Sequence, residues 1–328
     1  MKNIMPITRQ KSGKKFVYFL GDQKISDQRE IDRINALVIP PAWKEVEIAK
    51  SAAVKIQAKG IDTAGRTQAI YSQAFRLKQE KLKFEKILKF AEKLPKLRKQ
   101  VAKDLARKKL GEEKVVACIV KLIDEQFFRI GSEQYAKEHQ TYGITTLRSK
   151  HANISRTTVT FDFIGKSGKE HVKKVSDPQI AHIVQQLDDM PGYELFKYID
   201  AEGNIKDVHS SNVNNYIKRY MGKQFSAKDF RTWGGTLLAT SALLAEDEAA
   251  DQTKTATAKK ITAAVKQVAK RLGNTPAVAK SSYIDPRVFV AYEDGATLPK
   301  IKLAMANMKP KKYLTVEEQC VLEILQKR

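Results

Sequence analysis

The sequence predicts an α+β protein with a small β-rich N-terminal domain, residues 1–78, and a mainly α-helical C-terminal domain, residues 79–328, that contains one β-hairpin. Three observations predict this class. Short stretches of β-branched and aromatic residues, separated by Gly, Pro and Asp, fill the first part of the chain. Apolar residues then recur at helical spacing over most of the remainder. One stretch with a period of two interrupts the helices. A chain of 328 residues is long enough for two domains.

In the N-terminal part, "KKFVYFLG" and "AVKIQAKGID" are typical of strands. "IPPAW", residues 39–43, predicts a connection stiffened by its prolines. From about Gln79 the pattern becomes helical and rich in lysine, and we expect Pro95 to interrupt that helix. "EKVVACIVKLIDEQFFRIG" continues as a helix.

The period-two stretch is "RTTVTFDFIGKSGKEHVKKV", which places Val159, Phe161 and Phe163 on one face. Its "GKSGK" predicts the turn of a β-hairpin. Residues 178–272 return to helical spacing, broken by "EDEAADQTKTATA", which we expect to be a polar, mobile connection. The last of these helices should end at Gly273 and bury one apolar face. That face comprises Ile261, Val265, Val268 and Leu272.

The composition predicts a folded, intracellular protein that binds a polyanion. Hydrophobic residues make up 42% and charged residues 30%. Lys and Arg number 60 against 37 Asp and Glu, a net charge of +23, so nucleic acid is the first candidate partner. The two cysteines have no CxxC spacing, which argues against a zinc site or a disulfide framework. We expect no secretory signal and no transmembrane helix.

Four stretches carry residues suited to phosphoryl transfer on a diester. They supply Arg129, then Lys166 in the hairpin turn, then Arg231 in "KDFRTWGGT", and finally Asn274 nine residues before Tyr283. Two arginines can clamp a phosphate and neutralise the charge of its transition state. A lysine can protonate a leaving alkoxide, and a tyrosine can attack phosphorus. Such a set needs neither metal nor nucleotide cofactor, and we expect none.

Each of these positions alone has an ordinary interpretation. Arg231 could form a local ion pair with Asp229, and Lys166 could be a solvated turn residue. Tyr283 is one of 11 tyrosines, and Tyr292 lies nearby as a competing nucleophile. The order and spacing of all four stretches carry the hypothesis.

Taken together, the stretches resemble the type IB DNA topoisomerases, specifically the small poxvirus-like and bacterial forms. "FRIGSEQYAKEHQTYGITTL", "FIGKSGKEH", "KDFRTWGGT" and "GNTPAVAKSSYIDP" match the family's blocks in order. "IPPAW" and "IQAKGIDTAGRTQAIY" resemble its small β-rich domain, so the resemblance covers nearly the whole chain. It implies relaxation of supercoiled DNA by transient cleavage of one strand, and a catalytic domain related to that of the tyrosine recombinases.

The resemblance also implies roles for individual residues. Tyr283 would be the nucleophile that forms a 3′-phosphotyrosyl intermediate, and Lys166 the general acid for the 5′-oxygen. Arg129 and Arg231 would clamp the phosphate. Asn274 stands where the poxvirus enzymes carry histidine, so it would donate a hydrogen bond without a charge.

The family further implies duplex DNA as partner, clamped by the N-terminal domain. We expect a monomer located in the cytoplasm, on the nucleoid if the host is bacterial. Ala69 departs from the aromatic residue of the poxvirus pattern, which puts strict site recognition in doubt. The expected DNA contacts are Arg66, Gln68, Tyr71, Tyr135, Lys137 and Lys228.

Three other functions remain open from the residues. A tyrosine recombinase shares the nucleophile and the clamp, but Lys228 replaces its usual histidine, and the sequence shows no obvious helix after Tyr283 for exchange between protomers. A non-enzymatic architectural DNA binder would fit the charge. An RNA-processing protein would also fit the charge, but not the order of the motifs.

Overall fold

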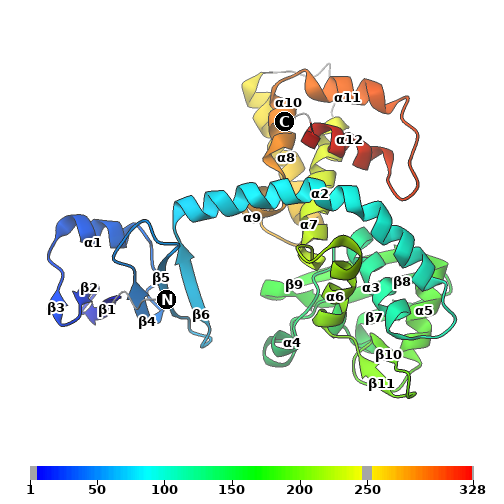
Figure 1. The fold of residues 1–328 in the computed structure, drawn as a ribbon, viewed down its shortest axis with the longest axis horizontal. Coiled ribbons are helices and arrows are strands. Elements are labelled where there is room, and N and C mark those ends of the chain that lie inside the picture. The colour runs from blue at the N-terminus through cyan, green and yellow to red at the C-terminus, as the bar shows by residue number, and fades with distance from the viewer. Residues whose placement is uncertain (1–5, 246–252, 327–328) are drawn as a thin grey trace. The chain divides into compact units, whose positions relative to one another are not determined.

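The computed structural model describes residues 6–245 and 253–326. The chain divides into two compact units, one ending at Glu85 and one beginning at Lys86 (Figure 1). The division after Glu85 falls inside helix α2, Gln73–Leu105. The domain boundary expected from the sequence, after residue 78, falls inside the same helix. The first unit is built on a β-sheet and the second is mainly helical, so the predicted α+β class is confirmed.

The first unit contains an antiparallel six-stranded sheet in the order β3-β2-β1-β4-β5-β6. Helix α1, Gln28–Asn35, buries Ile34 in the core of this unit. The strands are β1 (Ile7–Ser12), β2 (Lys15–Leu20), β3 (Gln23–Lys24), β4 (Lys44–Ile48), β5 (Ile56–Ile61) and β6 (Thr67–Tyr71). The "IPPAW" connection is fastened by Arg9, whose guanidinium donates to the carbonyls of Ile39, Pro40 and Trp43 at 2.8–3.2 Å. An arginine bound to three carbonyls therefore adds to the stiffness that the prolines provide.

The second unit combines helices with two small antiparallel sheets, β7-β8-β9 and β10-β11. Its strands are β7 (Ala152–Ile154), β8 (Thr158–Gly165), β9 (Lys169–Ser176), β10 (Lys197–Ile199) and β11 (Ile205–Asp207). After α2, its helices are α3 (Glu112–Gln126), α4 (Glu133–His139), α5 (Pro178–Asp188), α6 (Ser210–Met221), α7 (Ala227–Leu244), α8 (Lys254–Leu272), α9 (Pro276–Tyr283), α10 (Pro286–Glu293), α11 (Thr297–Met305) and α12 (Val316–Gln326). Short 3₁₀ turns occupy Ile144–Thr146, Ser149–His151 and Lys166–Gly168.

Helix α2 runs through Pro95, so the predicted interruption there is wrong. Proline lacks the N–H that would bond one turn back, and its ring crowds that turn, which together cost about 3 kcal/mol. The neighbouring residues Ala91, Leu94 and Leu97 are buried in the core of the second unit. Tertiary packing on both sides of the proline therefore outweighs its local preference.

The hairpin is confirmed as β8 and β9, which pair from Thr158↔Ser176 to Gly165↔Lys169. Val159, Phe161 and Phe163 are all buried, as their spacing predicts. The hairpin β10–β11 was missed inside a region expected to be helical. Its three-residue strands are too short for an alternating pattern to be recognised.

Helices α8 and α10–α12 form a second core together with the C-terminal half of α7 (Figure 1). Helix α8 buries the four apolar residues that its pattern predicts and ends at Gly273, whose φ is +63°. The polar connection expected over 246–258 lies outside the described residues up to 252, and from Lys254 onward the chain is helical. The sequence shows no obvious helix after Tyr283, but α10, α11 and α12 follow it and bury apolar residues in this core.

Candidate active site

The end of helix α3 places Arg129. The helix stops at Phe127, which adopts a left-handed conformation with φ of +57°, and its N–H bonds to the Ile123 carbonyl. The next residue, Phe128, is buried, and Arg129 follows half-buried. Its Nη2 donates to Asn274 Oδ1 at 2.6 Å and to the Gly273 carbonyl at 3.1 Å. The structure thus joins two of the predicted site residues, which lie 145 positions apart.

Arg231 lies in the first turns of α7 and is 4% exposed. Its Nη1 donates to the Phe127 carbonyl at 2.6 Å and its Nη2 to the Leu272 carbonyl at 2.8 Å. The guanidinium carbon lies 5.0 Å from the centre of the Tyr283 ring. A buried arginine at the start of a core helix is therefore held by the ends of two other helices, α3 and α8.

The alternative of an ion pair between Arg231 and Asp229 is excluded. Positions two apart on a helix point away from each other. Asp229 instead caps α7 by accepting from the Ser226 N–H at 2.8 Å, and it pairs with Lys86 at 2.6 Å. Arg231 instead donates to backbone carbonyls and lies beside the Tyr283 ring.

Tyr283 is the last residue of α9, and its side chain is half-buried. Its backbone packs so closely on Gly235 of α7 that a Cβ at residue 235 would lie 2.5 Å from the Tyr283 carbonyl oxygen. Burial alone would raise the pKa of the phenol. The charge and hydrogen bonding of Arg231, with the charges of Arg129 and Lys228, outweigh burial and lower that pKa below its usual value. The surroundings therefore make the phenol easier to deprotonate than an ordinary tyrosine.

Both arginines remain cations at neutral pH. Burial, followed by the charge of Arg231, lowers the pKa of Arg129 to about 10. Burial also lowers the pKa of Arg231 from its usual value. Two like charges held close together in a desolvated place are costly unless an anion binds there.

Two donors in this cluster are buried without a partner among the described residues, namely Arg231 Nε and Asn274 Nδ2. A buried donor that lacks an acceptor costs about 1–3 kcal/mol. Both groups carry N–H bonds, so the missing partner is an acceptor. Beside two arginines, such a site suits an anion such as phosphate.

Lys166 lies at the tip of the β8–β9 hairpin and is exposed. Ser167 and Gly168 form the turn with φ of +65° and +69°. The described residues show no hydrogen bond or ion pair that brings its amine into contact with the arginines or Tyr283. The structure therefore assembles four of the five predicted catalytic residues and leaves the fifth at the end of a neighbouring hairpin.

Sequence reasoning missed Lys173, which is 5% exposed on β9. Its Nζ donates to the Gln126 carbonyl at 2.6 Å, at the end of α3. Burial, followed by the charges of Arg271, Arg231 and Arg129, lowers its pKa to about 7. The signal that could have found it is the hairpin register, which pairs Lys173 with the buried residue Phe161.

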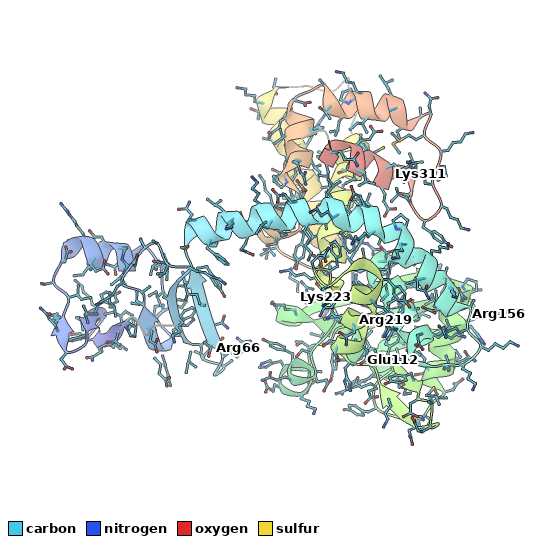
Figure 2. The ribbon with its side chains drawn as sticks, in the orientation of Figure 1. Arg66, Glu112, Arg156, Arg219, Lys223 and Lys311 are labelled. Atoms are coloured by element: carbon cyan, nitrogen blue, oxygen red, sulfur yellow. The ribbon has the colours of Figure 1, made fainter. Side chains whose placement is uncertain are left out.

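The six expected DNA contacts lie in four places. Arg66 ends the β5–β6 turn and Gln68 lies in β6, and both bond to Asp62, at 2.9 and 3.0 Å (Figure 2 labels Arg66). Tyr71, at the end of β6, is 41% exposed and stacks on Phe75. Tyr135 and Lys137 are exposed on α4, and Lys228 is exposed in the first turn of α7.

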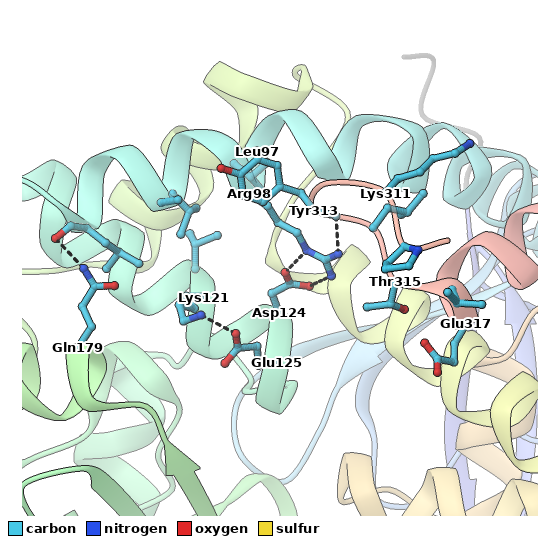
Figure 3. Close-up of a pocket in the computed structure, with 17 residues that line it drawn as sticks. Leu97, Arg98, Lys121, Asp124, Glu125, Gln179, Lys311, Tyr313, Thr315 and Glu317 are labelled. Atoms are coloured by element: carbon cyan, nitrogen blue, oxygen red, sulfur yellow. Dashed lines mark hydrogen bonds and ion pairs between the residues drawn. The ribbon is translucent and has the colours of Figure 1, made fainter. Parts of the chain in front are cut away.

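A cavity of about 680 Å³ lies between α2, α3 and the segment that leads into α12 (Figure 3). Arg98 crosses it, bonding to both carboxylate oxygens of Asp124 and of Glu318 at 2.6–3.0 Å and to the Tyr313 carbonyl at 2.9 Å. Glu318 also accepts from Trp233 Nε1 at 3.1 Å. None of the predicted site residues lines this cavity. Glu318 nevertheless connects its ion pairs to Trp233 of α7, two residues after Arg231.

The described residues contain no group of three or more His, Cys, Asp and Glu side chains arranged to hold a metal ion. Among the helices in the described part of the chain, none is long and apolar enough to span a membrane.

A half-buried tyrosine beside two arginines suits the binding of an anion such as a phosphodiester. Residues 72–308 match the model of the eukaryotic DNA topoisomerase I catalytic core, and residues 15–62 match that of the bacterial DNA topoisomerase IB N-terminal domain. The chain is 34% identical to DNA topoisomerase 1B of Acanthamoeba polyphaga mimivirus over 94% of this chain and 93% of that protein. It is 24% identical to DNA topoisomerase I of monkeypox virus over 54% of each chain. The chain belongs to the type IB DNA topoisomerases.

Proposed function

We propose that this protein relaxes supercoiled duplex DNA by cutting and resealing one strand through Tyr283. The phenolic oxygen attacks a backbone phosphorus, and the bond from phosphorus to the 5′-oxygen breaks. The product is a 3′-phosphotyrosyl linkage and a free 5′-hydroxyl, so the energy of the bond is retained. Attack by that hydroxyl on the same phosphorus releases Tyr283 and restores the strand.

Arg129, Arg231 and Asn274 stabilise the charge that builds on the non-bridging oxygens. The observation that carries this assignment is the pair of buried donors without partners, Arg231 Nε and Asn274 Nδ2. Each belongs to a side chain whose other polar atoms are already fixed by hydrogen bonds. A phosphate that accepted from both would complete the donor set.

Lys166 gives its proton to the departing 5′-oxygen. Its exposed position on a hairpin tip suits a residue that reaches its partner when DNA is bound. The protein's own cations supply the positive charge, so the reaction needs neither metal nor nucleotide. Relaxation should continue in the presence of EDTA, and its loss on chelation would refute this mechanism.

The β-rich domain, residues 1–78, would close around the duplex, and the helical domain, residues 79–328, would hold the chemistry. Arg66, Gln68 and Tyr71 would contact DNA from the first, and Tyr135, Lys137 and Lys228 from the second. We propose that the protein acts as a monomer in the compartment that contains the DNA, the cytoplasm or nucleoid of a bacterial host. Its helical domain would share its ancestry with the tyrosine recombinases.

The decisive experiment compares Tyr283→Phe with Tyr292→Phe. Tyr283→Phe keeps the ring and removes the attacking oxygen, so covalent attachment to DNA should vanish. Duplex binding should persist, because it rests on contacts of Lys and Arg with phosphates. Tyr292→Phe is the matched control and should retain relaxation. After denaturation during turnover and digestion, the labelled peptide should contain "SSYIDPR". A label on Tyr292 would overturn the assignment.

A further inference from the structure

His171 ends a row of stacked rings that begins beside Arg129. On β9 it lies opposite Phe163 of β8, and the two rings stack with centres 5.2 Å apart. Phe163 in turn stacks on Phe128 at 5.7 Å and an interplanar angle of 16°. Phe128 immediately precedes Arg129. The row therefore connects the hairpin to the segment that carries an arginine of the site.

The far edge of the His171 ring contacts two glycines. A Cβ built on Gly165 would lie 2.6 Å from His171 Cδ2, and one built on Gly273 would lie 2.1 Å from His171 Cε1. Real Cβ atoms essentially never come that close to another atom. The ring therefore fills the space that side chains at residues 165 and 273 would need.

These two glycines are the neighbours of site residues. Gly165 precedes Lys166, and Gly273 precedes Asn274. The Gly273 carbonyl also accepts from Arg129. One imidazole ring thus packs against both the base of the hairpin tip and the turn that carries Asn274.

We propose that His171 is a positioning residue that sets the distance between the Lys166 hairpin tip and the Arg129–Asn274 turn. This inference rests on the function proposed above. Without the ring, the hairpin base could shift toward or away from residue 273, and the amine of Lys166 would no longer meet the leaving oxygen. A misplacement of about 1 Å is enough to cost on the order of 100-fold in rate.

The environment of the ring fits a steric role. Burial, followed by the charges of Lys173, Arg129, Arg231 and Lys169, lowers the pKa of His171 to about 4. At neutral pH the imidazole is therefore uncharged and adds no repulsion to an already cationic site. An ordinary core histidine would also be neutral, so the test must report on Lys166 in particular.

The test measures single-turnover cleavage by His171→Ala on two duplexes that differ only in the leaving atom, a 5′-bridging oxygen or a 5′-bridging sulfur. A thiolate leaves without protonation, so only the oxygen substrate needs Lys166. We expect His171→Ala to slow cleavage of the oxygen substrate by about 10- to 100-fold and of the sulfur substrate much less. The double variant Lys166→Ala/His171→Ala should cleave the oxygen substrate no more slowly than Lys166→Ala alone. His182→Ala, an exposed site on α5, is the control and should cleave both substrates normally.

A second variant tests the contact itself. Gly165→Ala forces a methyl group against the His171 ring, so it should slow cleavage of the oxygen substrate in the natural background. In the His171→Ala background the space is empty, and Gly165→Ala should have almost no further effect. Because Gly165 has a negative φ of −98°, the alanine adds no backbone strain. If His171→Ala fails to fold, Gly165→Ala alone tests the positioning role. The test is then whether Gly165→Ala slows cleavage of the oxygen substrate more than cleavage of the sulfur substrate.

The outcomes separate the inference from the proposed function. Equal slowing on both substrates by His171→Ala, or by Gly165→Ala where only that variant folds, would overturn the positioning role and leave His171 as a core residue. If Lys166→Ala itself slows both substrates equally, the general-acid assignment fails and the inference falls with it. If Lys166→Ala discriminates between them but neither His171→Ala nor Gly165→Ala does, only the inference is wrong.

Discussion

Replacing Gly235 by alanine sets two effects of known size against each other. Gly235 lies inside helix α7, where alanine is favoured over glycine by about 1 kcal/mol. Helix propensity alone therefore predicts a more stable protein. However, the new Cβ would lie 2.5 Å from the Tyr283 carbonyl oxygen and 3.0 Å from the Tyr283 Cβ. Overpacking of this kind costs about 1–3 kcal/mol.

The displacement matters more for activity than for stability. Backbone atoms cannot rotate away, so the end of α9 must move by about 1 Å to reach ordinary van der Waals contact. The net change in the free energy of unfolding should lie between zero and about −2 kcal/mol. The rate of covalent adduct formation should fall by about 100-fold, because Tyr283 leaves its place beside Arg231.

The assay is single-turnover cleavage of a labelled duplex, paired with urea unfolding of the same sample. Gly111→Ala is the matched control, because its Cβ would meet only the Ile199 carbonyl oxygen, at 3.9 Å. That variant should keep its cleavage rate. A Gly235→Ala protein that is stabilised and cleaves at the natural rate would refute the close packing of α7 on Tyr283.

Arg98→Ala should lower the free energy of unfolding by about 3–5 kcal/mol in a urea titration, because it leaves the carboxylates of Asp124 and Glu318 unpaired. As a control, Lys81→Ala should change it little, because Lys81 forms only an exposed ion pair with Glu85 at 4.0 Å. In the folded protein the pKa of Lys173 is about 7, compared with an ordinary value of 10.5. Between pH 7 and 10.5 the unfolded chain therefore binds more protons than the folded one. The free energy of unfolding should rise with pH over this range, by up to about 1.4 kcal/mol per pH unit. Lys173→Met should remove that slope, and an unchanged slope would exclude Lys173 as its source. Because the protein carries a net charge of +23, its affinity for duplex DNA should fall steeply as salt is raised. In filter binding, a plot of the log of the binding constant against the log of the salt concentration should have a slope of several units. A flat plot would mean that the charge serves another partner.

The sequence was sufficient to predict the elements with strong periodicity. The β8–β9 hairpin and helix α8 follow their patterns because one face of each is buried against a core. The path of α2 through Pro95 could not be predicted, because packing by residues distant in sequence decides it. Strands β10 and β11 are too short to carry a period at all.

For the site, the order of motifs indicated candidate residues but could not predict which atoms they contact. That Arg231 donates to the carbonyls of Phe127 and Leu272 depends on where two helices end in space. Lys173 looked like one more lysine in a basic strand, and only the register shows it facing inward. Interactions with backbone atoms leave no signature in the residue types involved.

The way Arg129 and Arg231 are held limits how this cluster can change over generations. The atoms that hold Arg129 and Arg231 are largely main-chain oxygens, those of Phe127, Leu272 and Gly273. No side-chain substitution at these three positions deletes the acceptor, so the acceptors can survive mutations that alter everything around them. For the same reason, paired substitutions between each arginine and these supports should not appear among relatives. Covariation analysis would therefore miss the most important contacts in this site, although they lie between segments more than 40 residues apart.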